Sequence, residues 1–227
     1  MRQLRNEIKG KSLGLTPHET SSVHTAAIFR CLGDQDLQRL LREAPYREYS
    51  KGAIVLEPEP GDHLCIIARG GIRLSLLSQQ GRSLTLRSLR PGDIFDMHDV
   101  DTAESLMDGT CIYSIQWDRF LRHIYQHPDA VFALVTILRQ RACQDHVLLK
   151  DVAFETMHTR LGRALVMLAR ENPEHNVQEK HSEFGALVGA EREDVTKAFS
   201  HFRRLGLIRS APDHKGIQVL QEEGLTA

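Results

Sequence analysis

Long apolar runs are missing from this chain: its 227 residues contain no uninterrupted hydrophobic stretch of about 18 residues. A transmembrane helix needs about 20 such residues, so we expect no membrane-spanning segment. The first 15 residues, MRQLRNEIKGKSLGL, also lack the apolar core of a secretory signal. We therefore expect a cytoplasmic protein.

Cysteine is scarce as well. The four cysteines lie 34, 46 and 32 residues apart, at Cys31, Cys65, Cys111 and Cys143. This spacing is not typical of a disulfide-rich scaffold, of a zinc knuckle, or of the convergent thiolates of an iron–sulfur site. We expect reduced cysteines and no iron–sulfur cluster.

An excess of charge of one sign is absent too. Lys and Arg number 29 and Asp and Glu number 30, which gives a net charge of −1 with histidine neutral. The chain is 41% hydrophobic and 26% charged, so it has the apolar material for folded cores, and this excludes a disordered protein. The length predicts one large domain or two small ones, and any nucleic-acid site has to be a local basic patch.

Sequence signatures of catalysis are also missing. The chain has no G-x-S-x-G, P-loop, H-E-x-x-H or C-x-x-C pattern. The strongest enzyme alternative is a cupin-like β-barrel metalloenzyme, which needs two or three histidines at H-x-H spacing. The barrel-like region described next contains only His63 and His98, so we interpret the protein as a non-enzyme.

Between about residues 46 and 116, short apolar runs such as HLCIIARGG and IRLSLLSQQGR alternate with Gly and Pro turns. This pattern predicts a compact antiparallel barrel or sandwich. A helix is predicted just before it, over 34–43, with Asp34 as its N-cap and with Leu37, Leu40 and Leu41 at helical spacing. Residues 1–25 carry no sustained period, and we interpret them as a mobile or partner-docked arm.

From about residue 117 the pattern is helical, with helices predicted over 117–126 and roughly 128–151. The long helix carries a stripe in alternating steps of four and three residues, through Val131, Val135, Leu138, Ala142, Asp145, Leu149 and Val152. This heptad seam favours a parallel homodimer, and the alternative is packing on the chain's own β region. Asp145 is the one polar residue of the seam, and two facing copies would repel each other.

The strongest pattern comes after a further predicted helix over 155–171. A short apolar helix contains Phe184, Leu187 and Val188, Gly189 follows at a turn, and the next helix has Val195, Ala198, Phe199 and Phe202 inward. Two strand-like runs come next, which predicts a helix-turn-helix with a β wing. The other face of the second helix presents Arg192, Glu193, Thr196, Lys197 and Arg203, and residues 192–215 hold six Lys and Arg against three Asp and Glu. We predict a DNA-binding face here, with an ordinary solvated helical hairpin as the alternative.

Three segments are the most specific: PGDIF (91–95), LRQRACQDHVLLKDVAFETMHTRLGRAL (138–165) and EFGALVGAEREDVTKAF (183–199). Over about 26–222 the chain resembles the cyclic-AMP receptor protein/FNR (CRP/FNR) family of bacterial transcription factors. The resemblance implies an α+β fold with an N-terminal antiparallel β-roll, a long dimerisation helix and a C-terminal winged helix-turn-helix. The implied domains are an arm (1–25), an effector-sensing β-roll (26–127), the dimerisation helix (128–152) and the DNA-binding domain (153–227).

The family's recognition helix often reads S-R-E-T-V-x-R, and this chain has Glu191 to Lys197 in its place. The resemblance therefore implies that Arg192, Glu193 and Lys197 read bases, in a palindromic double-stranded DNA site with G·C-containing half-sites. Lys197 offers a point charge where the family has the planar fork of Arg. The resemblance also implies a homodimer and RNA polymerase as a partner.

The family binds effectors in the β-roll against the long helix. Cyclic AMP needs basic groups for its phosphate, yet residues 91–111 contain no Lys or Arg and six acidic residues: Asp93, Asp96, Asp99, Asp101, Glu104 and Asp108. This acidic run predicts repulsion of a phosphate, so we expect an effector other than cyclic AMP. The run together with His98 also leaves open a hard metal ion.

The segment GDIFDMHDV (92–100) is similar to the G-D-x-F-C-M-H segment of the carbon-monoxide-sensing haem members, in which the histidine ligates iron. The matching ligand here is His98, with Asp96 where those members have a cysteine and Arg139 where they have a small residue. The effector or haem candidates are Asp96, Met97 and His98 together with Leu138, Arg139 and Ala142 on the long helix. The resemblance to those members implies that the arm donates a second ligand across the dimer, with His18 and His24 as further candidates. Haem, another small molecule or metal, a redox-responsive site and an effector-independent regulator all stay open.

Overall fold

The computed structural model of the protein describes residues 9–10, 23, 26–42, 44–55, 62–98, 100–172, 176–178, 180–211 and 216–226. The chain forms two compact units. One unit contains Met1–Ser75 and Arg87–Cys143, and the other contains Leu76–Leu86 and Gln144–Ala227.

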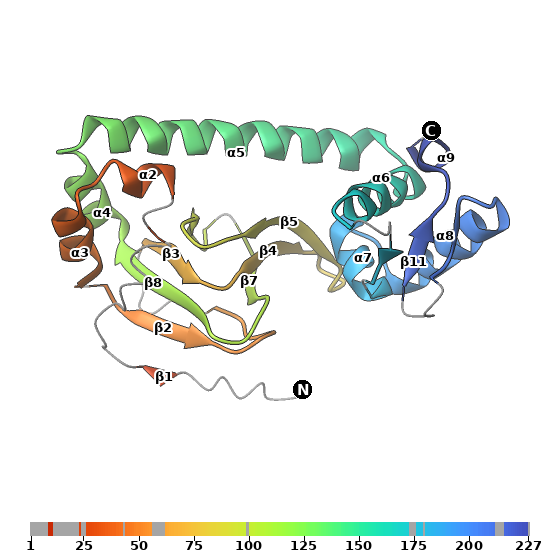
Figure 1. The fold of residues 1–227 in the computed structure, drawn as a ribbon, viewed down its shortest axis with the longest axis horizontal. Helices are drawn as coiled ribbons and strands as arrows, with labels where there is room; N and C mark the ends of the chain where they lie inside the picture. Colours follow the sequence, from red (N-terminus) through yellow and green to blue (C-terminus); the bar gives the residue numbers. More distant parts are fainter. Residues whose placement is uncertain are drawn as a thin grey trace. The chain divides into compact units, whose positions relative to one another are not determined.

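Two antiparallel sheets form the N-terminal β region (Figure 1). The larger has the strand order β1-β2-β8-β3-β6 and the smaller has the order β5-β4-β7. Their bounds are β1 Lys9–Gly10, β2 Tyr46–Tyr49, β3 His63–Arg69, β4 Ile72–Leu77, β5 Ser83–Leu89, β6 Ile94–Phe95, β7 Thr102–Ser105 and β8 Thr110–Gln116. The central pair is β3 and β8, in register from His63↔Gln116 to Ile67↔Ile112. Both strands are almost wholly buried, as their continuous apolar runs require, and the predicted β-roll is confirmed.

Helices pack against the larger sheet: α2 Ala27–Arg30, α3 Asp34–Arg42, α4 Trp117–Ile124 and the start of α5 Pro128–Phe154. The predicted core positions Leu37, Leu40 and Leu41 are buried, whereas Asp34 is the first residue of α3 and not its N-cap. Ala130 and Leu134 are the buried residues of α5, which anchor its N-terminal turns in the core. The helix runs three residues beyond the predicted end at 151.

Only three positions of the predicted arm are described. Lys9 and Gly10 form β1, which pairs with Glu48 and Arg47 of β2, and Val23 is fully buried in the core. These positions therefore belong to the β-roll. The two arm histidines, His18 and His24, lie outside the described residues.

The C-terminal part of the chain has its own core. Its elements are α6 Met157–Arg170, β9 Asn176–Val177, α7 His181–Val188, α8 Arg192–Arg204, β10 Ile208–Ser210, β11 Ile217–Val219 and α9 Glu222–Thr226. Strands β10, β11 and β9 form a three-stranded antiparallel sheet, and α7 and α8 form the predicted helix-turn-helix (Figure 1). No helix in the described part of the chain is long and apolar enough to cross a membrane.

Candidate DNA-binding interface and effector region

Two glycines shape the turn between α7 and α8. Gly189 ends α7 in the left-handed conformation, with φ of 69°, which side chains rarely adopt. Gly185 lies where the chain folds back closely: its carbonyl accepts from the Ala190 N–H at 2.9 Å, and a Cβ at this position would lie 2.6 Å from the Ala190 carbonyl oxygen. The sequence G-x-x-x-G in this helix thus permits the tight turn that sets α8 against α7.

The inward face of α8 is fixed by aromatic packing. Phe184 of α7 and Phe199 of α8 are both fully buried, and their rings meet edge to face with centroids 5.0 Å apart. The predicted inward residues of α8 are buried as expected: Val195, Ala198, Phe199 and Phe202. A helix locked on one side in this way presents its opposite side in one orientation.

The five predicted DNA contacts share the opposite side of α8. At about 100° per residue they span an arc of about 140°. All five are exposed: Arg192, Glu193, Thr196, Lys197 and Arg203. Over 192–211 the described chain has five basic residues, Arg192, Lys197, Arg203, Arg204 and Arg209, against two acidic ones, Glu193 and Asp194, a balance of +3. The loop 212–215 lies outside the described residues. This exposed face combines positive charge with hydrogen-bonding side chains, which is the chemistry of a DNA major-groove reader.

Lys197 and Thr196 each have a local partner on α8. The Lys197 Nζ lies 3.5 Å from the Asp194 Oδ1, and both side chains are mostly exposed. The Thr196 hydroxyl donates to the Arg192 carbonyl oxygen at 2.8 Å. An exposed ion pair of this kind is weak, so a phosphate or base can displace Asp194 from Lys197 at small cost.

Sequence reasoning missed Arg160 of α6, which holds the C-terminal end of α7 by a hydrogen bond. Its guanidinium donates to the carbonyl oxygens of Val152 at 3.3 Å and Glu155 at 3.1 Å, and to that of Val188 at 3.0 Å. One side chain thus satisfies carbonyl groups at the ends of both α5 and α7. The family-like segment around 160 was visible in the sequence, but a pattern does not show which carbonyls an arginine reaches.

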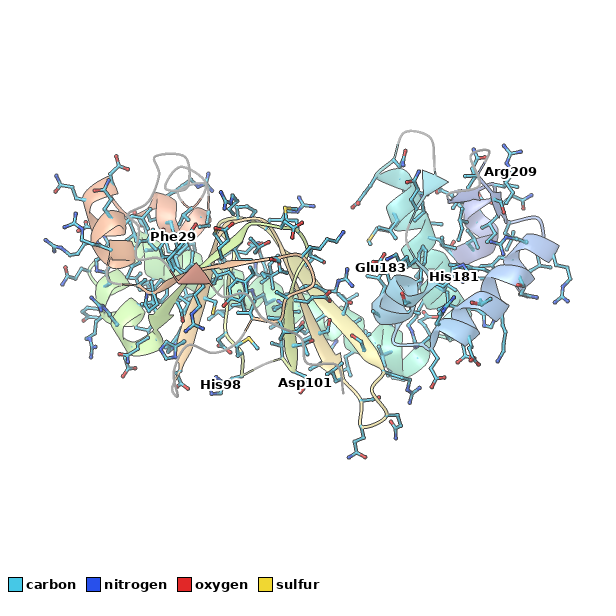
Figure 2. The ribbon with its side chains drawn as sticks, turned by 90° about the horizontal axis from the view of Figure 1, so that it is seen from below. Phe29, His98, Asp101, His181, Glu183 and Arg209 are labelled. Carbon is cyan, nitrogen blue, oxygen red and sulfur yellow. The ribbon has the colours of Figure 1, made fainter. Side chains whose placement is uncertain are left out.

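His181, labelled in Figure 2, was missed as well, although it lies beside Thr196, one of the predicted DNA contacts. It is the first residue of α7, and its Nδ1 lies 2.9 Å from the Thr196 hydroxyl oxygen. Its ring packs edge-on against Phe199. Burial, together with the nearby charges of Arg203 and Arg192, lowers the pKa of His181 below its ordinary value of 6.5. The only signal in the sequence was the position of His181 at the start of a helix. Its partner Thr196 lies 15 residues further along the chain.

In the β-roll, the structure brings together two of the predicted effector residues. The His98 Nε2 lies 3.2 Å from the Asp62 Oδ1, its Nδ1 lies 4.0 Å from the Asp96 Oδ1, and its backbone N–H donates to the same Asp96 oxygen at 2.8 Å (Figure 2). A cavity of about 220 Å³ adjoins them, lined by Asp62, His63, Asp96, His98 and Trp117. Among the described residues, no group of three or more His, Cys, Asp or Glu side chains is placed to hold a metal ion.

The predicted α5 side of the effector site does not line this cavity. Leu138, Arg139 and Ala142 are exposed on α5, whereas the guanidinium of Arg141 donates to the Ile94 carbonyl oxygen. Met97 is half-buried and lies next to His98 in the chain.

Haem does not fit the residues around His98. Pockets for ligands of drug size measure about 300–1,000 Å³ and are mainly apolar. The cavity here is about 220 Å³, and two carboxylates and two imidazoles line it with one indole. The carboxylates of Asp62 and Asp96 also lie beside the His98 ring, and their negative charge would repel the propionates of a haem.

Three members of the acidic run have structural roles. Asp93 accepts the Arg90 N–H at 2.8 Å, Asp96 accepts that of His98, and Asp108 accepts that of Lys51 at 2.8 Å. Asp93 and Asp96 close local turns, and Asp108 joins two segments 57 residues apart; neither use of Asp needs a ligand. They still add negative charge to this part of the β-roll.

Comparison with known proteins gives consistent matches over both parts of the chain. The Crp-like helix-turn-helix domain matches residues 159–227. The chain is 29% identical over 190 residues to the transcriptional regulator SdrP of Thermus thermophilus, covering 78% of this chain and 90% of that protein. It is 26% identical over 192 residues to the cyclic AMP receptor protein of the same organism, covering 82% of this chain and 89% of that protein.

Among solved structures, a variant of CooA from Carboxydothermus hydrogenoformans is similar to this chain with a TM-score of 0.67 and 20% sequence identity. The match covers 82% of this chain and 88% of that chain. At this identity the likeness shows the fold alone, which is the β-roll, long helix and helix-turn-helix described above.

Proposed function

Because the chain belongs to the CRP/FNR family of transcription regulators and carries their helix-turn-helix DNA-binding domain, we propose that it acts as a homodimer on a palindromic double-stranded DNA site. The exposed face of α8 carries the proposal. Arg192, Glu193 and Lys197 project from it while its other face is locked in the core. An Arg suits the O6 and N7 of guanine and a Glu accepts from the N4 of cytosine, so the proposed half-sites contain G·C pairs.

The dimer rests on the exposed stripe of α5. Val135 is 57% exposed, Leu138 46% and Leu149 65%, and the predicted seam continues through Val131, Ala142, Asp145 and Val152. Only the N-terminal turns of α5 are held in the chain's own core. An apolar stripe of this length and period is a surface that a second α5 covers in a parallel coiled coil.

The β-roll is proposed to hold a small effector that is not cyclic AMP, and haem is not assigned to it. An effector that binds one arrangement of the dimer more tightly shifts the population towards that arrangement. The arrangement that binds DNA places the two α8 helices in successive major grooves, about 34 Å apart. RNA polymerase is the proposed partner of the DNA-bound dimer, on the family resemblance. An effector-independent or redox- or metal-responsive regulator is the alternative within the same family.

A selection from randomised duplexes tests the proposal. Purified protein at micromolar concentration should enrich a palindrome whose half-site centres are about 10 base pairs apart, and a labelled copy of it should be retarded in a gel. The double variant Arg192→Ala/Lys197→Ala should lose that binding.

The matched control is Arg39→Ala/Arg42→Ala, which removes the same charge from the exposed side of α3. Equal loss in both double variants would mean that net charge, and not the α8 face, governs binding. No enriched sequence, with a monomer in sedimentation, would overturn the proposal.

A further inference from the structure

The side chain of His181 has a defined protonation pattern in the free protein. The Thr196 hydroxyl has one hydrogen, which it donates to the Arg192 carbonyl oxygen at 2.8 Å. Its oxygen therefore accepts from His181, across the 2.9 Å to Nδ1. Nδ1 carries a hydrogen in both charge states of the ring, and Nε2 is the atom that gains or loses the proton.

Charged groups surround this ring mainly on the α8 side. Arg192 and Arg203 are the cations whose charge opposes a second positive charge on His181. On α7 itself, Lys180 precedes the ring, and the Glu183 carboxylate accepts the Lys180 backbone N–H at 3.2 Å (Figure 2). The Phe199 ring also packs against it, with ring centroids 5.0 Å apart. Burial and two arginines that belong to the proposed DNA face therefore lower the pKa of the imidazole in the free protein.

We propose that His181 is a DNA-backbone contact that takes up a proton when the protein binds DNA. The proposal rests on the proposed function, because it needs the exposed face of α8 to meet DNA. Thr196 lies between Arg192 and Arg203 along the axis of α8, and its hydroxyl oxygen is 2.9 Å from the His181 Nδ1. We therefore expect a phosphate drawn to these arginines to come near Nε2. The phosphate neutralises the repulsion from the arginines and accepts a hydrogen bond from the protonated ring.

The direction of the pH dependence follows by linkage. Because the complex binds a proton that the free protein lacks, DNA affinity rises as pH falls. The gain starts below the pKa of His181 in the complex. It levels off below the pKa in the free protein, where the ring is already charged before DNA binds. At most one proton per protomer is taken up.

The experiment measures binding of the full-length protein to the selected duplex by fluorescence anisotropy, between about pH 8 and about pH 6. We expect affinity to rise roughly 10-fold over this range, and calorimetry in buffers of different ionisation enthalpy should show proton uptake. The dependence of log K on log salt should steepen at the lower pH by roughly 0.9 per protomer, the value for one further phosphate contact.

Three variants separate the inference from a structural role of the ring. His181→Gln should lose the rise in DNA affinity at lower pH. His181→Arg should bind tightly at both pH values and lose the pH dependence. His127→Gln is the matched control: its histidine faces Asp36 in the N-terminal unit and should leave the dependence unchanged.

The outcomes of the two proposals are distinguishable. Wild-type protein that binds no selected duplex at either pH overturns the proposed function. Protein that binds DNA while His181→Gln keeps the full pH dependence and salt slope overturns the inference about His181 alone. If His181→Gln is misfolded by circular dichroism, His181→Arg decides: a pH dependence equal to that of the wild type overturns the inference.

Discussion

The guanidinium of Arg160 on α6 donates to the carbonyl oxygen of Val188, the last residue of α7, across 3.0 Å. The same guanidinium binds carbonyl oxygens at the end of α5, including those of Val152 and Glu155. Backbone carbonyls at a helix end have no partner within the helix, so a charged donor that reaches two such ends holds both in place. Arg160 therefore sets the position of the turn that precedes α8.

Replacing Arg160 tests this role. Arg160→Met keeps an unbranched apolar stem and removes every donor. It should lower the free energy of unfolding by about 2 kcal/mol, because bonds from charged donors are lost and the carbonyls stay half-buried. Urea unfolding of the full chain measures the change. The control is Arg163→Met: Arg163 makes exposed ion pairs with Asp151 at 3.0 Å and Glu155 at 2.9 Å, whose loss should cost less than about 1 kcal/mol. If both variants lose the same free energy of unfolding, Arg160 does not have this role at the ends of α5 and α7.

Arg192 gives a prediction about specificity. Arg192→Ala should cost about 1–3 kcal/mol on the selected duplex, and that cost should vanish on a duplex in which one G·C pair of the half-site is replaced, because the discriminating bidentate contact is then absent in both proteins. Competition binding with singly substituted duplexes measures it. If the variant keeps the wild-type ratio of affinities for the two duplexes, Arg192 does not read that base.

Asp145 gives a prediction about assembly. In the proposed seam two Asp145 carboxylates face each other, and like charges at a helix pair repel. Asp145→Leu should tighten the dimer in analytical ultracentrifugation. Gln140→Leu adds a similar side chain two residues from Leu138, on the other side of α5, and should leave the dimer constant unchanged. If Asp145→Leu also leaves it unchanged, Asp145 does not lie in the seam.

The sequence predicted the elements that carry a strong period. The predicted helices 34–43 and 117–126 correspond to α3 Asp34–Arg42 and α4 Trp117–Ile124, and the inward residues of α8 were correctly chosen. Their periodicity comes from burial of one face, which a single sequence records. Strands β1 and β9 have two residues each and arise from pairing with partners far along the chain, so no local pattern marked them.

The candidate sites divide in the same way. The exposed face of α8 could be predicted because the hydrophobic period marks the buried face, and the exposed residues lie opposite it. The bond from His181 to Thr196 spans 15 residues, that from Arg141 to Ile94 spans 47, and that of the His98 ring to Asp62 joins two loops. Such contacts depend on how the elements pack against one another. The period of hydrophobic residues in the sequence does not show that packing.

The cavity beside His98 predicts the outcome of a haem-loading experiment. Protein expressed with a haem precursor should show no Soret band that shifts with carbon monoxide after reduction with dithionite. The reason is that a cavity of about 220 Å³ faced by Asp62 and Asp96 is small and acidic for a haem. Visible absorption spectroscopy measures this directly. A band that shifts with carbon monoxide and disappears in His98→Ala would contradict the prediction and restore His98 as an iron ligand.

His181 also predicts how folding stability depends on pH in the absence of DNA. Its pKa in the folded protein lies below 6.5, its ordinary value, so the unfolded chain binds the proton more readily. Its contribution to stability is therefore complete above about pH 6.5 and is lost as pH falls towards the folded-state pKa.

Between about pH 7.5 and pH 5.5 the wild type should lose more thermal stability than His181→Gln, which has no proton to gain. Differential scanning calorimetry of both proteins at the two pH values gives the difference, in which the carboxylates common to both cancel. A difference of the opposite sign would mean that the folded state favours the charged ring even without DNA, and that Arg192 and Arg203 do not repel it.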